Sequence, residues 1–544
     1  MSKIAFIRML KHAVFCISNL GITGELMHLP YIFKHFIFSN LMVGPISRKV
    51  VTESIWKLFS TITGQVGALI FVVIISRILK PEGFGVYNLV LAIVLIFITF
   101  ADAGINRAVL RYVSASLGKN DKKKASSYVK YLLKLKFSLL IVLAIILIAI
   151  AYPLSFFVFN KPELFLPLII ISFYLIAISL ESFFAQLFYA LKKLKYLAIK
   201  QIIFQILRIS LVLLVFALLM GKNLLIEILM IVVLSNFVAL FVLLFFLRKH
   251  ASFLFQRTDK KIDKKRVFRF IKYFAVAGIS SPIFGYIDTL MLGAFLPIAF
   301  VGYYSASFGL IMAISGFILV SAVLLPVFTQ LKDSQLKEAF DKVFRYVGII
   351  TIPLLFGALA LGKYLIRLIY GHEYLSGALP FSFLTLLIFS TLLSGVIVSL
   401  FSAREKPEYF VKILLFSSVL NIVLNYIFIK GFMNISLIWA MTGAGIATIT
   451  SRYFYLFSLG RTASKNLGIR FKPVFVIKPL VASVLMFLTL FYINRFVEDI
   501  TLLIGLGEVI LGAGIYLVVM FLIGGLNNED VEMIKSVIKR EKSD

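Results

Sequence analysis

Runs of apolar residues separated by short polar connections occupy almost the whole chain after residue 50. Fourteen such runs can be drawn, and many exceed the roughly 18 residues that a helix needs to cross a bilayer. Because a helix satisfies its own backbone hydrogen bonds in lipid, the pattern predicts an all-α polytopic membrane protein with about 14 transmembrane helices. The expected spans are 55–79, 84–106, 129–152, 163–189, 197–220, 224–247, 268–295, 298–328, 342–370, 375–402, 408–429, 433–458, 474–493 and 500–524.

The composition indicates that this chain is embedded in lipid. Of the 544 residues, 61% are hydrophobic, only 15% are charged, and 55 are phenylalanine. Soluble domains are near half apolar and about a quarter charged. A water-soluble core could not bury this much apolar surface, so we expect a multi-pass protein of the cell membrane.

Basic residues outnumber acidic ones, and their positions along the chain indicate their role. The chain has 56 Lys and Arg against 25 Asp and Glu, a formal net charge of +31. With both termini in the cytoplasm, 47 of the Lys and Arg fall on inner segments and 8 on outer ones. The positive-inside rule predicts this alternation for an even number of spans. We therefore expect both termini to be cytoplasmic, anionic membrane lipids to meet the basic segments, and nucleic acid not to be a partner.

The chain divides into five segments. Residues 1–48 form an N-terminal arm with no run of spanning length, which is either interfacial and amphipathic or an extension ahead of a true start, for example at Met42. Residues 49–247 form a first six-helix bundle and 248–267 a basic cytoplasmic linker. Residues 268–459 form a second six-helix bundle, and 460–544 hold two extra helices and a cytoplasmic tail.

The two bundles show signs of an internal repeat. The segment FYALKKLKY at 188–196 matches FSAREKPEY at 401–409 in four of nine positions, at an offset of 213. The segment LKPEGFGVY at 79–87 shares Leu, Gly and Tyr with LPIAFVGYY at 296–304, at an offset of 217. Because six spans is an even number, the two halves keep one orientation, and an axis along the membrane normal would relate them.

These same segments resemble a known family. SRILKPEGFGVYNLV and FADAGINRAVLRYVSAS in the first half, and YIDTLMLGAFLPIAFVGYYSAS and FSAREKPEYF in the second, are similar to the polysaccharide-biosynthesis membrane proteins. These are the O-antigen-type flippases of the multidrug/oligosaccharidyl-lipid/polysaccharide exporter superfamily. The resemblance covers roughly residues 50–525, and the N-terminal arm departs from it.

The resemblance implies a secondary transporter that moves a polyprenyl-linked oligosaccharide from the inner to the outer leaflet by alternating access. Such a protein needs a polar, preferably cationic, cavity for the sugar-pyrophosphate headgroup. Its expected partners are the lipid-linked oligosaccharide, membrane lipids and other membrane proteins of glycan assembly. The alternatives are a multidrug or organic-cation exporter of the same superfamily and a membrane glycan polymerase or glycosyltransferase.

Polar residues inside the spans are the candidates for the substrate cavity, since each is costly in lipid. Gln201, Gln205 and Arg208 follow i, i+4, i+7 and share one face of the fifth span. At the offset of 213 the eleventh span carries Asn421, which matches Arg208, and Asn425. We interpret these faces as opposite walls of one cavity, with Arg208 contacting pyrophosphate or sugar. The alternative for Arg208 is a buried ion pair with Glu181.

Acidic residues inside the spans are candidates for Na⁺ or H⁺ coupling. Glu181 is one, with the ion pair to Arg208 as its alternative role. Asp288 is the other, because it follows a Ser-Ser-Pro break at 280–282 whose freed carbonyls could help to bind a cation. A hydrogen-bonded helix contact is the alternative for Asp288, and an interfacial salt bridge is favoured for Asp102.

Catalytic and cofactor motifs are missing from the sequence. The chain has no GxxxxGK[ST] phosphate loop, and its outer acidic residues are scattered over separate connections. A single cysteine, Cys16, and five dispersed histidines indicate no metal site. We therefore expect a protein that is not an enzyme and that carries no cofactor beyond a coupling ion.

Overall fold

The computed structural model describes residues 48–102, 104–218, 223–256, 258, 260–317, 320–469, 471–496 and 502–526. The expected N-terminal arm, except Arg48, and the expected C-terminal tail from residue 527 on lie outside the described residues.

All regular elements of the described residues are helical, which confirms the all-α prediction. The first half contains α3 (Arg48–Asp102), α4 (Ile105–Ala108), α5 (Ser114–Gly118), α6 (Lys122–Pro153), α7 (Phe165–Leu191), α8 (Lys195–Leu218) and α9 (Leu224–Ala251). The second half contains α10 (Lys264–Phe295), α11 (Ile298–Phe317), α12 (Val320–Gln330), α13 (Asp333–Ile369), α14 (Ala378–Leu384), α15 (Leu387–Ala403), α16 (Pro407–Met433) and α17 (Leu437–Leu467). Two further helices follow, α18 (Val474–Ile493) and α19 (Leu502–Leu522).

Each of the fourteen expected spans overlaps one helix or one pair of helices. Within the described residues, ten helices are long and apolar enough to cross a membrane, or eleven if the bent pair α14–α15 is one span. The first of them, Ile55–Asp102, holds two expected spans because α3 is broken at Lys80, which has φ 57° and precedes Pro81. The expected spans 268–295 and 433–458 correspond to the more polar α10 and α17.

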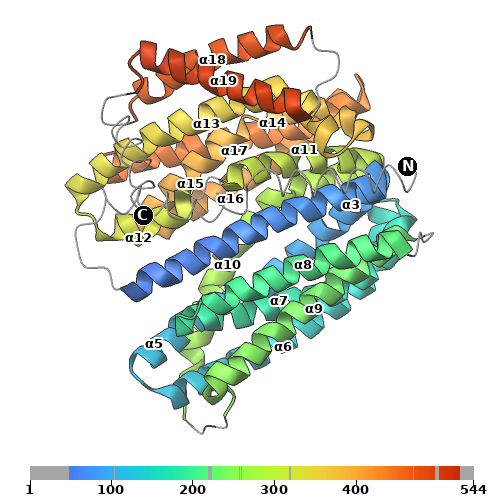
Figure 1. Ribbon diagram of the computed structural model, residues 1–544. Coiled ribbons are helices and arrows are strands. Elements are labelled where there is room, and N and C mark those ends of the chain that lie inside the picture. Colours follow the sequence, from blue (N-terminus) through green and yellow to red (C-terminus); the bar gives the residue numbers. More distant parts are fainter. Residues whose placement is uncertain are drawn as a thin grey trace.

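The two halves form two packed groups of helices, with the last two helices at one edge. In Figure 1, α6, α7, α8 and α9 lie together at the bottom, and α13, α15 and α17 lie above the central α3. Helices α18 and α19 pack against each other and against α13, at the top of the view. The last two helices therefore contact the second half and stand apart from the first.

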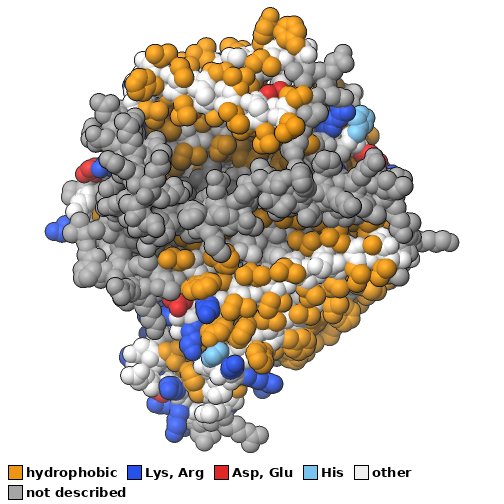
Figure 2. Space-filling view, in the orientation of Figure 1, with side chains coloured by type: hydrophobic (Ala, Val, Ile, Leu, Met, Phe, Trp, Pro, Cys, Tyr) orange, Lys and Arg blue, Asp and Glu red, His pale blue; other side chains and the backbone are white. Residues whose placement is uncertain are grey.

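Most of the exposed surface in the spanning segments is apolar. Phe157, Phe241 and Phe245 are 76%, 63% and 61% exposed. Figure 2 shows hydrophobic side chains over the faces of α8 and α9, while Lys and Arg gather at the lower left. An apolar belt with charge confined to its ends is the surface of a helical protein embedded in lipid.

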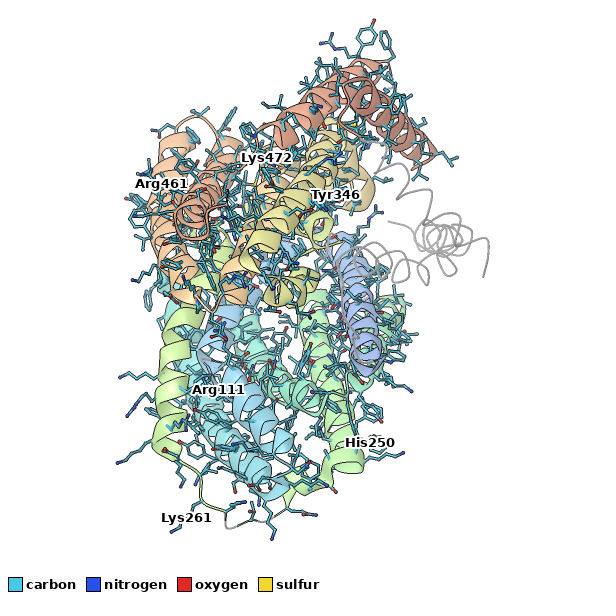
Figure 3. The ribbon with its side chains drawn as sticks, turned by 90° about the vertical axis from the view of Figure 1, so that its left-hand side faces the viewer. Arg111, His250, Lys261, Tyr346, Arg461 and Lys472 are labelled. Atoms are coloured by element: carbon cyan, nitrogen blue, oxygen red, sulfur yellow. The ribbon has the colours of Figure 1, made fainter. Side chains whose placement is uncertain are left out.

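The molecule has a basic end, which we define by the helix ends and connections that carry Arg111, His250, Lys261, Arg461 and Lys472. It is the left-hand end in Figure 1, where α5 and α12 lie, and Figure 3 looks onto it. The other end, with the connections near Lys80, Lys161 and Glu373, we call the weakly charged end.

The two halves meet closely at the weakly charged end through a reciprocal pair of glycines. A Cβ on Gly85 would lie 2.1 Å from the carbonyl oxygen of Ile298, and a Cβ on Gly302 would lie 2.1 Å from that of Pro81. Both Gly85 and Gly302, and Pro81 and Ile298, are separated by 217 residues, the offset of the sequence repeat. A contact made twice by equivalent residues is what a twofold axis between the halves produces.

Polar contacts reinforce this closure. Arg77 Nε donates to the carbonyl oxygen of Ile369 at 2.8 Å, and the Tyr374 hydroxyl donates to that of Ser76 at 2.8 Å. Lys161 Nζ crosses from the first half to the carbonyl oxygen of Gly293 at 2.6 Å, and burial lowers the pKa of this lysine. Each bond joins a residue of the first half to one of the second, so the weakly charged end is closed.

At the basic end the hydrophobic cores are separate. The main core combines residues of both halves near the weakly charged end with most of the second half. A distinct core fills the basic end of the first half, and α10 contributes Val267 and Ile271 to it. The halves therefore share one core at the closed end, whereas at the basic end α10 is the element that bridges them.

Replacing Gly302 by Ala should loosen the closed end, because the new Cβ has no room against Pro81. Overpacking of this kind costs about 1–3 kcal/mol. Buried Ser76, changed to Cys in a Cys16→Ser background, should then react with a membrane-impermeant maleimide about tenfold faster. Gly309→Ala on the same helix is the matched control, since a Cβ there meets nothing within 4 Å. Equal labelling rates in the two variants would contradict the assigned closure.

Candidate functional site

The polar face of the fifth span, which is α8, lies against the part of α3 that precedes the break at Lys80. Gln205 is buried, and its Nε2 donates to the carbonyl oxygen of Gly64 at 2.9 Å. A Cβ on Gly67 would lie 2.5 Å from Gln205, and one on Gly64 would lie 3.0 Å from Gln201. The two glycines therefore let α8 approach α3 and leave room for both glutamines between them.

Arg208 is held at this interface by an amide and two aromatic rings. Its Nη2 donates to Gln205 Oε1 at 2.6 Å. Its guanidinium carbon lies 3.9 Å from the ring centre of Phe71 and 4.8 Å from that of Phe204. The Nε atom is buried and has no hydrogen-bond partner among the described residues. Arg208 is thus a cation inside a span with an unpartnered Nε, and among the described residues it is held by cation–π contacts and Gln205 rather than by a carboxylate.

Glu181, the alternative partner expected for Arg208, forms an ion pair with a different cation. Glu181 on α7 accepts a bond from Lys200 Nζ at 2.6 Å, and the two side chains are 14% and 10% exposed. Lys200 also donates to Gln201 Oε1 at 3.1 Å. The Glu181–Arg208 ion pair weighed from the sequence is therefore not formed. The charge of Glu181 is balanced by a lysine that the sequence placed in a connection.

Lys200→Met should destabilise the protein by about 3 kcal/mol, because it leaves Glu181 charged and mostly buried without a partner. The double variant Glu181→Gln/Lys200→Met should recover most of this loss. Thermal unfolding of the purified protein in detergent measures both. The control is Lys195→Met, one turn earlier on α8, where the side chain is exposed. Additive effects of the two substitutions would show that the pair carries no coupling energy.

A second ion pair lies deeper in the first half. Asp102 and the fully buried Lys136 of α6 form a short ion pair, and Lys136 also donates to the carbonyl oxygen of Ala101 at 2.9 Å. Ser179 donates to Asp102 at 3.2 Å. The sequence favoured a salt bridge for Asp102 but assigned Lys136 to a basic connection. The position of Lys136 within the apolar run Leu132–Leu140 was the available sign of its burial.

The second half holds a buried polar cluster around Asp288 of α10. Its carboxylate accepts from Tyr304 Oη at 2.5 Å, from Asn425 Nδ2 at 2.8 Å and from the Thr448 hydroxyl. Asn421 Nδ2 donates to Thr448 Oγ1 at 3.1 Å, and Asn425 Nδ2 also donates to the carbonyl oxygen of Asn421 at 3.0 Å. All five side chains are buried. The cluster therefore joins four helices, α10, α11, α16 and α17, around one carboxylate.

This cluster retains unused oxygen atoms. The Oδ1 atoms of Asn421 and Asn425 are buried and have no hydrogen-bond partner among the described residues. With the carboxylate of Asp288 they form a set of hard oxygen donors, which suits a small cation such as Na⁺. Nearby, the guanidinium of Arg452 lies 4.1 Å from the ring centre of Phe284, one turn before Asp288 on α10.

The structure divides the expected site residues into two groups, one in each half. Gln201, Gln205 and Arg208 lie together between α3 and α8, with Glu181 beside them through Lys200. Asn421 and Asn425 lie with Asp288 inside the second half. The asparagines are fully buried and bonded within that half, so the structure does not bring them to a wall facing Arg208. Whether either group contacts substrate stays a prediction.

The two groups are nevertheless related by the repeat. Asp288 lies 217 residues after Phe71, and Tyr304 lies 217 after Tyr87, which interacts electrostatically with Arg208. Asn421 lies 213 residues after Arg208. The two groups therefore occupy corresponding regions of the two halves, although the guanidinium of Arg208 corresponds to Asn421 and the carboxylate of Asp288 corresponds to Phe71.

The sequence did not single out Tyr304, Thr448 or Lys200. Tyr304 could have been found, because it belongs to the repeated segment and pairs with Tyr87. Nothing in the sequence indicates the role of Thr448, since a threonine in a packed helix commonly donates to a carbonyl of its own helix. Its hydrogen bond to Asp288 depends on how α10 and α17 pack.

The fold is similar to those of two solved membrane proteins, one titled a flippase and the other a transporter. The structure titled "Lipid II flippase MurJ, inward closed conformation" aligns with a TM-score of 0.69 and 17% identity, over 87% of this chain and 98% of that one. A multidrug resistance MATE family transporter of the MOP superfamily, inward-facing, aligns with a TM-score of 0.62 and 13% identity, over 74% and 95%.

Sequence comparison identifies the family. A protein of Klebsiella pneumoniae described as "Uncharacterized membrane protein in cps region" is 24% identical over 500 residues, which are 87% of this chain and 95% of that protein. Residues 50–332 match the family described as "Polysaccharide biosynthesis protein". These residues are more than half of the chain, and they include most of the segments that carried the resemblance. The chain belongs to the polysaccharide biosynthesis protein family.

Proposed function

We propose that this protein is a flippase that translocates a polyprenyl-linked oligosaccharide, a precursor of a polysaccharide, across the cell membrane by alternating access. The observation that carries the proposal is Arg208, which lies inside a span of a polysaccharide biosynthesis family member. Among the described residues its guanidinium forms no ion pair with a carboxylate, and its Nε has no hydrogen-bond partner. A guanidinium binds phosphate oxygens through its forked donors. The pyrophosphate of the cargo is the matching anion, and Gln201 and Gln205 offer further hydrogen bonds to sugar or phosphate.

The arrangement of the two halves supports alternating access. They join through one shared core and several polar bonds at the weakly charged end, and through α10 at the basic end. The positive-inside rule assigns the basic end and both termini to the cytoplasm. The conformation is then closed toward the outside. Transport would require the reciprocal glycine contact to open while the basic ends approach each other.

The Asp288 cluster is the proposed site of ion coupling. A carboxylate and two unused amide oxygens suit Na⁺, and the carboxylate alone suits H⁺. Because the repeat relates this cluster to Arg208, each half would bind one of the two transported charges. The first half would take the anionic cargo and the second the cation that drives its movement. Glu181 is a weaker candidate, since Lys200 already neutralises it.

A multidrug exporter is the second candidate, and the likeness to MATE transporters favours it. Arg208 argues against a cationic cargo, because like charges in a low-dielectric site repel. The two helices α18 and α19, which pack outside the two bundles, would need a role in either case.

Depleting this protein from its native host tests the proposal. Mass spectrometry of the polyprenyl-linked glycans should then detect accumulation of one complete lipid-linked oligosaccharide, and its mass would identify the cargo. Leaflet sidedness should be measured alongside, with a membrane-impermeant glycosidase or lectin, and the accumulated species should lie in the inner leaflet. An unchanged lipid-linked pool with new sensitivity to cationic drugs would favour the exporter. Outer-leaflet accumulation of short glycans would indicate a lost polymerase, and crosslinking would identify any glycan-assembly partners.

A further inference from the structure

Arg452 is a second arginine inside a span, equally far from both ends of α17. Its guanidinium carbon lies 4.1 Å from the ring centre of Phe284, a side chain that is 2% exposed. Within the described part of the chain, Arg452 forms no ion pair and no hydrogen bond. A charge at this depth is costly and marks a functional candidate.

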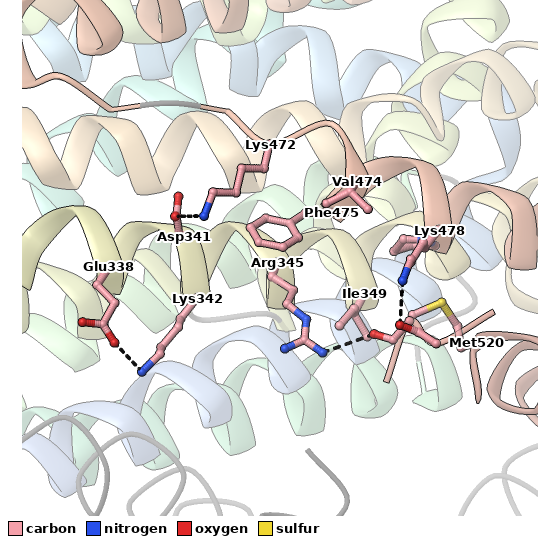
Figure 4. A pocket seen from close by; sticks show the side chains of 13 residues that line it. Glu338, Asp341, Lys342, Arg345, Ile349, Lys472, Val474, Phe475, Lys478 and Met520 are labelled. Atoms are coloured by element: carbon pink, nitrogen blue, oxygen red, sulfur yellow. Dashed lines mark hydrogen bonds and ion pairs between the residues drawn. The ribbon is translucent and has the colours of Figure 1, made fainter. Parts of the chain in front are cut away.

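Cations at the basic end of the second half are compensated differently. Figure 4 shows a cavity of about 430 Å³ there, between α13, α18 and α19. Lys342 pairs with Glu338 at 2.9 Å, and Lys472 pairs with Asp341 at 2.6 Å. Both lysines are exposed, whereas Arg452 is half-buried. The exposed cations have carboxylate partners, and the cation inside the span is held by an aromatic ring.

The register of two helices places Arg452 next to the Asp288 cluster. The Thr448 hydroxyl of α17 donates to Asp288 of α10. Arg452 follows Thr448 by one turn, and Phe284 precedes Asp288 by one turn, so the two contacts are successive layers between antiparallel helices. One turn is about 5.4 Å. The guanidinium and the carboxylate interact electrostatically across this layer.

The direction of the side chain lets Arg452 reach the carboxylate. Side chains on a helix lean toward its N-terminus, which for α17 lies at the weakly charged end. The lean carries Arg452 toward Thr448 and Asp288, so rotation about its side-chain bonds can move the guanidinium from Phe284 to the carboxylate. The forked donors of a guanidinium match a carboxylate. A guanidinium and a second cation at one carboxylate repel each other.

We propose that Arg452 is a tethered cation of the Asp288 cluster, which neutralises the carboxylate when it holds no Na⁺ and rests on Phe284 when it does. The inference rests on the ion site proposed for Asp288 and gives that site a second state. A buried carboxylate without a counter-charge is strongly destabilising. Arg452 would keep the cluster neutral in both states, and as a positioning residue it would set the affinity for Na⁺.

Titration of the full-length protein in detergent tests the inference, with NaCl replacing choline chloride at constant ionic strength and the unfolding temperature as the readout. Arg452→Gln should bind Na⁺ about 30-fold more tightly, because a like charge one turn away is removed. In choline chloride alone it should unfold at a lower temperature than the parent. Arg452→Lys keeps the charge and should stay near the parent. Arg461→Gln, an exposed cation of the same helix, should stay within about twofold.

Phe284→Leu should change the affinity in the opposite direction. Leucine fills much of the volume of the ring but offers no aromatic face, so the guanidinium loses the contact that holds it away from Asp288. Na⁺ binding should weaken about fivefold, which corresponds to the loss of one cation–π contact. Purely structural roles of Arg452 and Phe284 would not shift the affinity in opposite directions. Phe284→Leu also decides the question if Arg452→Gln fails to fold.

The outcomes separate this inference from the ion site itself. An unchanged Na⁺ affinity in Arg452→Gln, beside a parent that responds to Na⁺, would overturn the tethered cation and leave the ion site intact. Equal shifts in Arg452→Gln and Arg452→Lys would also overturn it, because shape rather than charge would be responsible. No response in either the parent or Arg452→Gln would reject both the tethered cation and the Na⁺ site. A response that appears only in Arg452→Gln would support the inference, since the guanidinium of the parent would then hold the carboxylate throughout.

Discussion

Arg208→Ala is expected to abolish transport while leaving the protein folded. We propose that the guanidinium donates two hydrogen bonds to a phosphate of the cargo. Hydrogen bonds to charged groups contribute about 1.5–3 kcal/mol each, so losing both should slow transport at least about 100-fold. The fold loses the cation–π contacts with Phe71 and Phe204, together worth about 1–2 kcal/mol, and one bond to Gln205. No buried carboxylate is stranded, because Glu181 keeps Lys200. Translocation of a lipid-linked oligosaccharide into proteoliposomes measures the first effect and thermal unfolding the second.

Two further substitutions sharpen this result. Arg208→Lys keeps the charge but loses the forked donors, and should retain part of the activity with a higher apparent KM for the cargo. Arg461→Ala removes an exposed arginine at the basic end and should transport normally. Transport that survives in Arg208→Ala would remove this residue from the substrate site. A variant that fails to fold would instead make Arg208 a structural element of the α3–α8 contact.

The order and type of the helices follow from the sequence, because lipid admits few alternatives for a long apolar run. The contact at the closed end could also be predicted in part from the sequence. Gly85 and Gly302 were found as matching letters of a repeat, but only the structure shows that each glycine admits the backbone of the other half. The repeat predicts an axis that relates the two halves, and its glycines also form the contact between them.

Side-chain partners could not be predicted in the same way. Arg208 and Glu181 are the two ionisable residues that stand out inside neighbouring spans, so pairing them is the simplest assumption. Lys200 lies closer to Glu181 because α7 and α8 run antiparallel from the connection at 192–194, which brings their basic ends together. Asn421 and Asn425 were assigned to a cavity wall because polar residues on one helix face need a polar neighbour. In the structure the polar neighbour of Asn425 is Asp288, and contact of either asparagine with the cargo stays a prediction. Periodicity identifies the face of a helix but not the element that covers it.

Asp288→Asn is the second substitution for which we expect a large effect, and it should uncouple transport from its driving ion. The carboxylate is the charged member of the cluster formed with Tyr304, Asn425 and Thr448, and asparagine preserves its size. If Na⁺ binds here, it stabilises the folded protein by RT ln(1 + [Na⁺]/Kd), about 2.7 kcal/mol at 100 times Kd. The rise in unfolding temperature in NaCl relative to choline chloride should therefore vanish in the variant, together with Na⁺-driven transport.

A matched control on the same helix separates this effect from general loss of charge. Asp263→Asn replaces the residue that caps α10, where the side chain accepts from the Arg266 backbone nitrogen at 2.9 Å, and asparagine caps as well as aspartate. It should keep the full response to Na⁺. A parent protein whose stability and transport respond to pH but not to Na⁺ would assign Asp288 to H⁺ instead. If Asp288→Asn retains the ion response of the parent, the cluster is only a structural contact between α10, α11, α16 and α17, and coupling must reside elsewhere. Glu181 would then be the next residue to test, because an ion that displaces Lys200 from it would also free Gln201 beside Arg208.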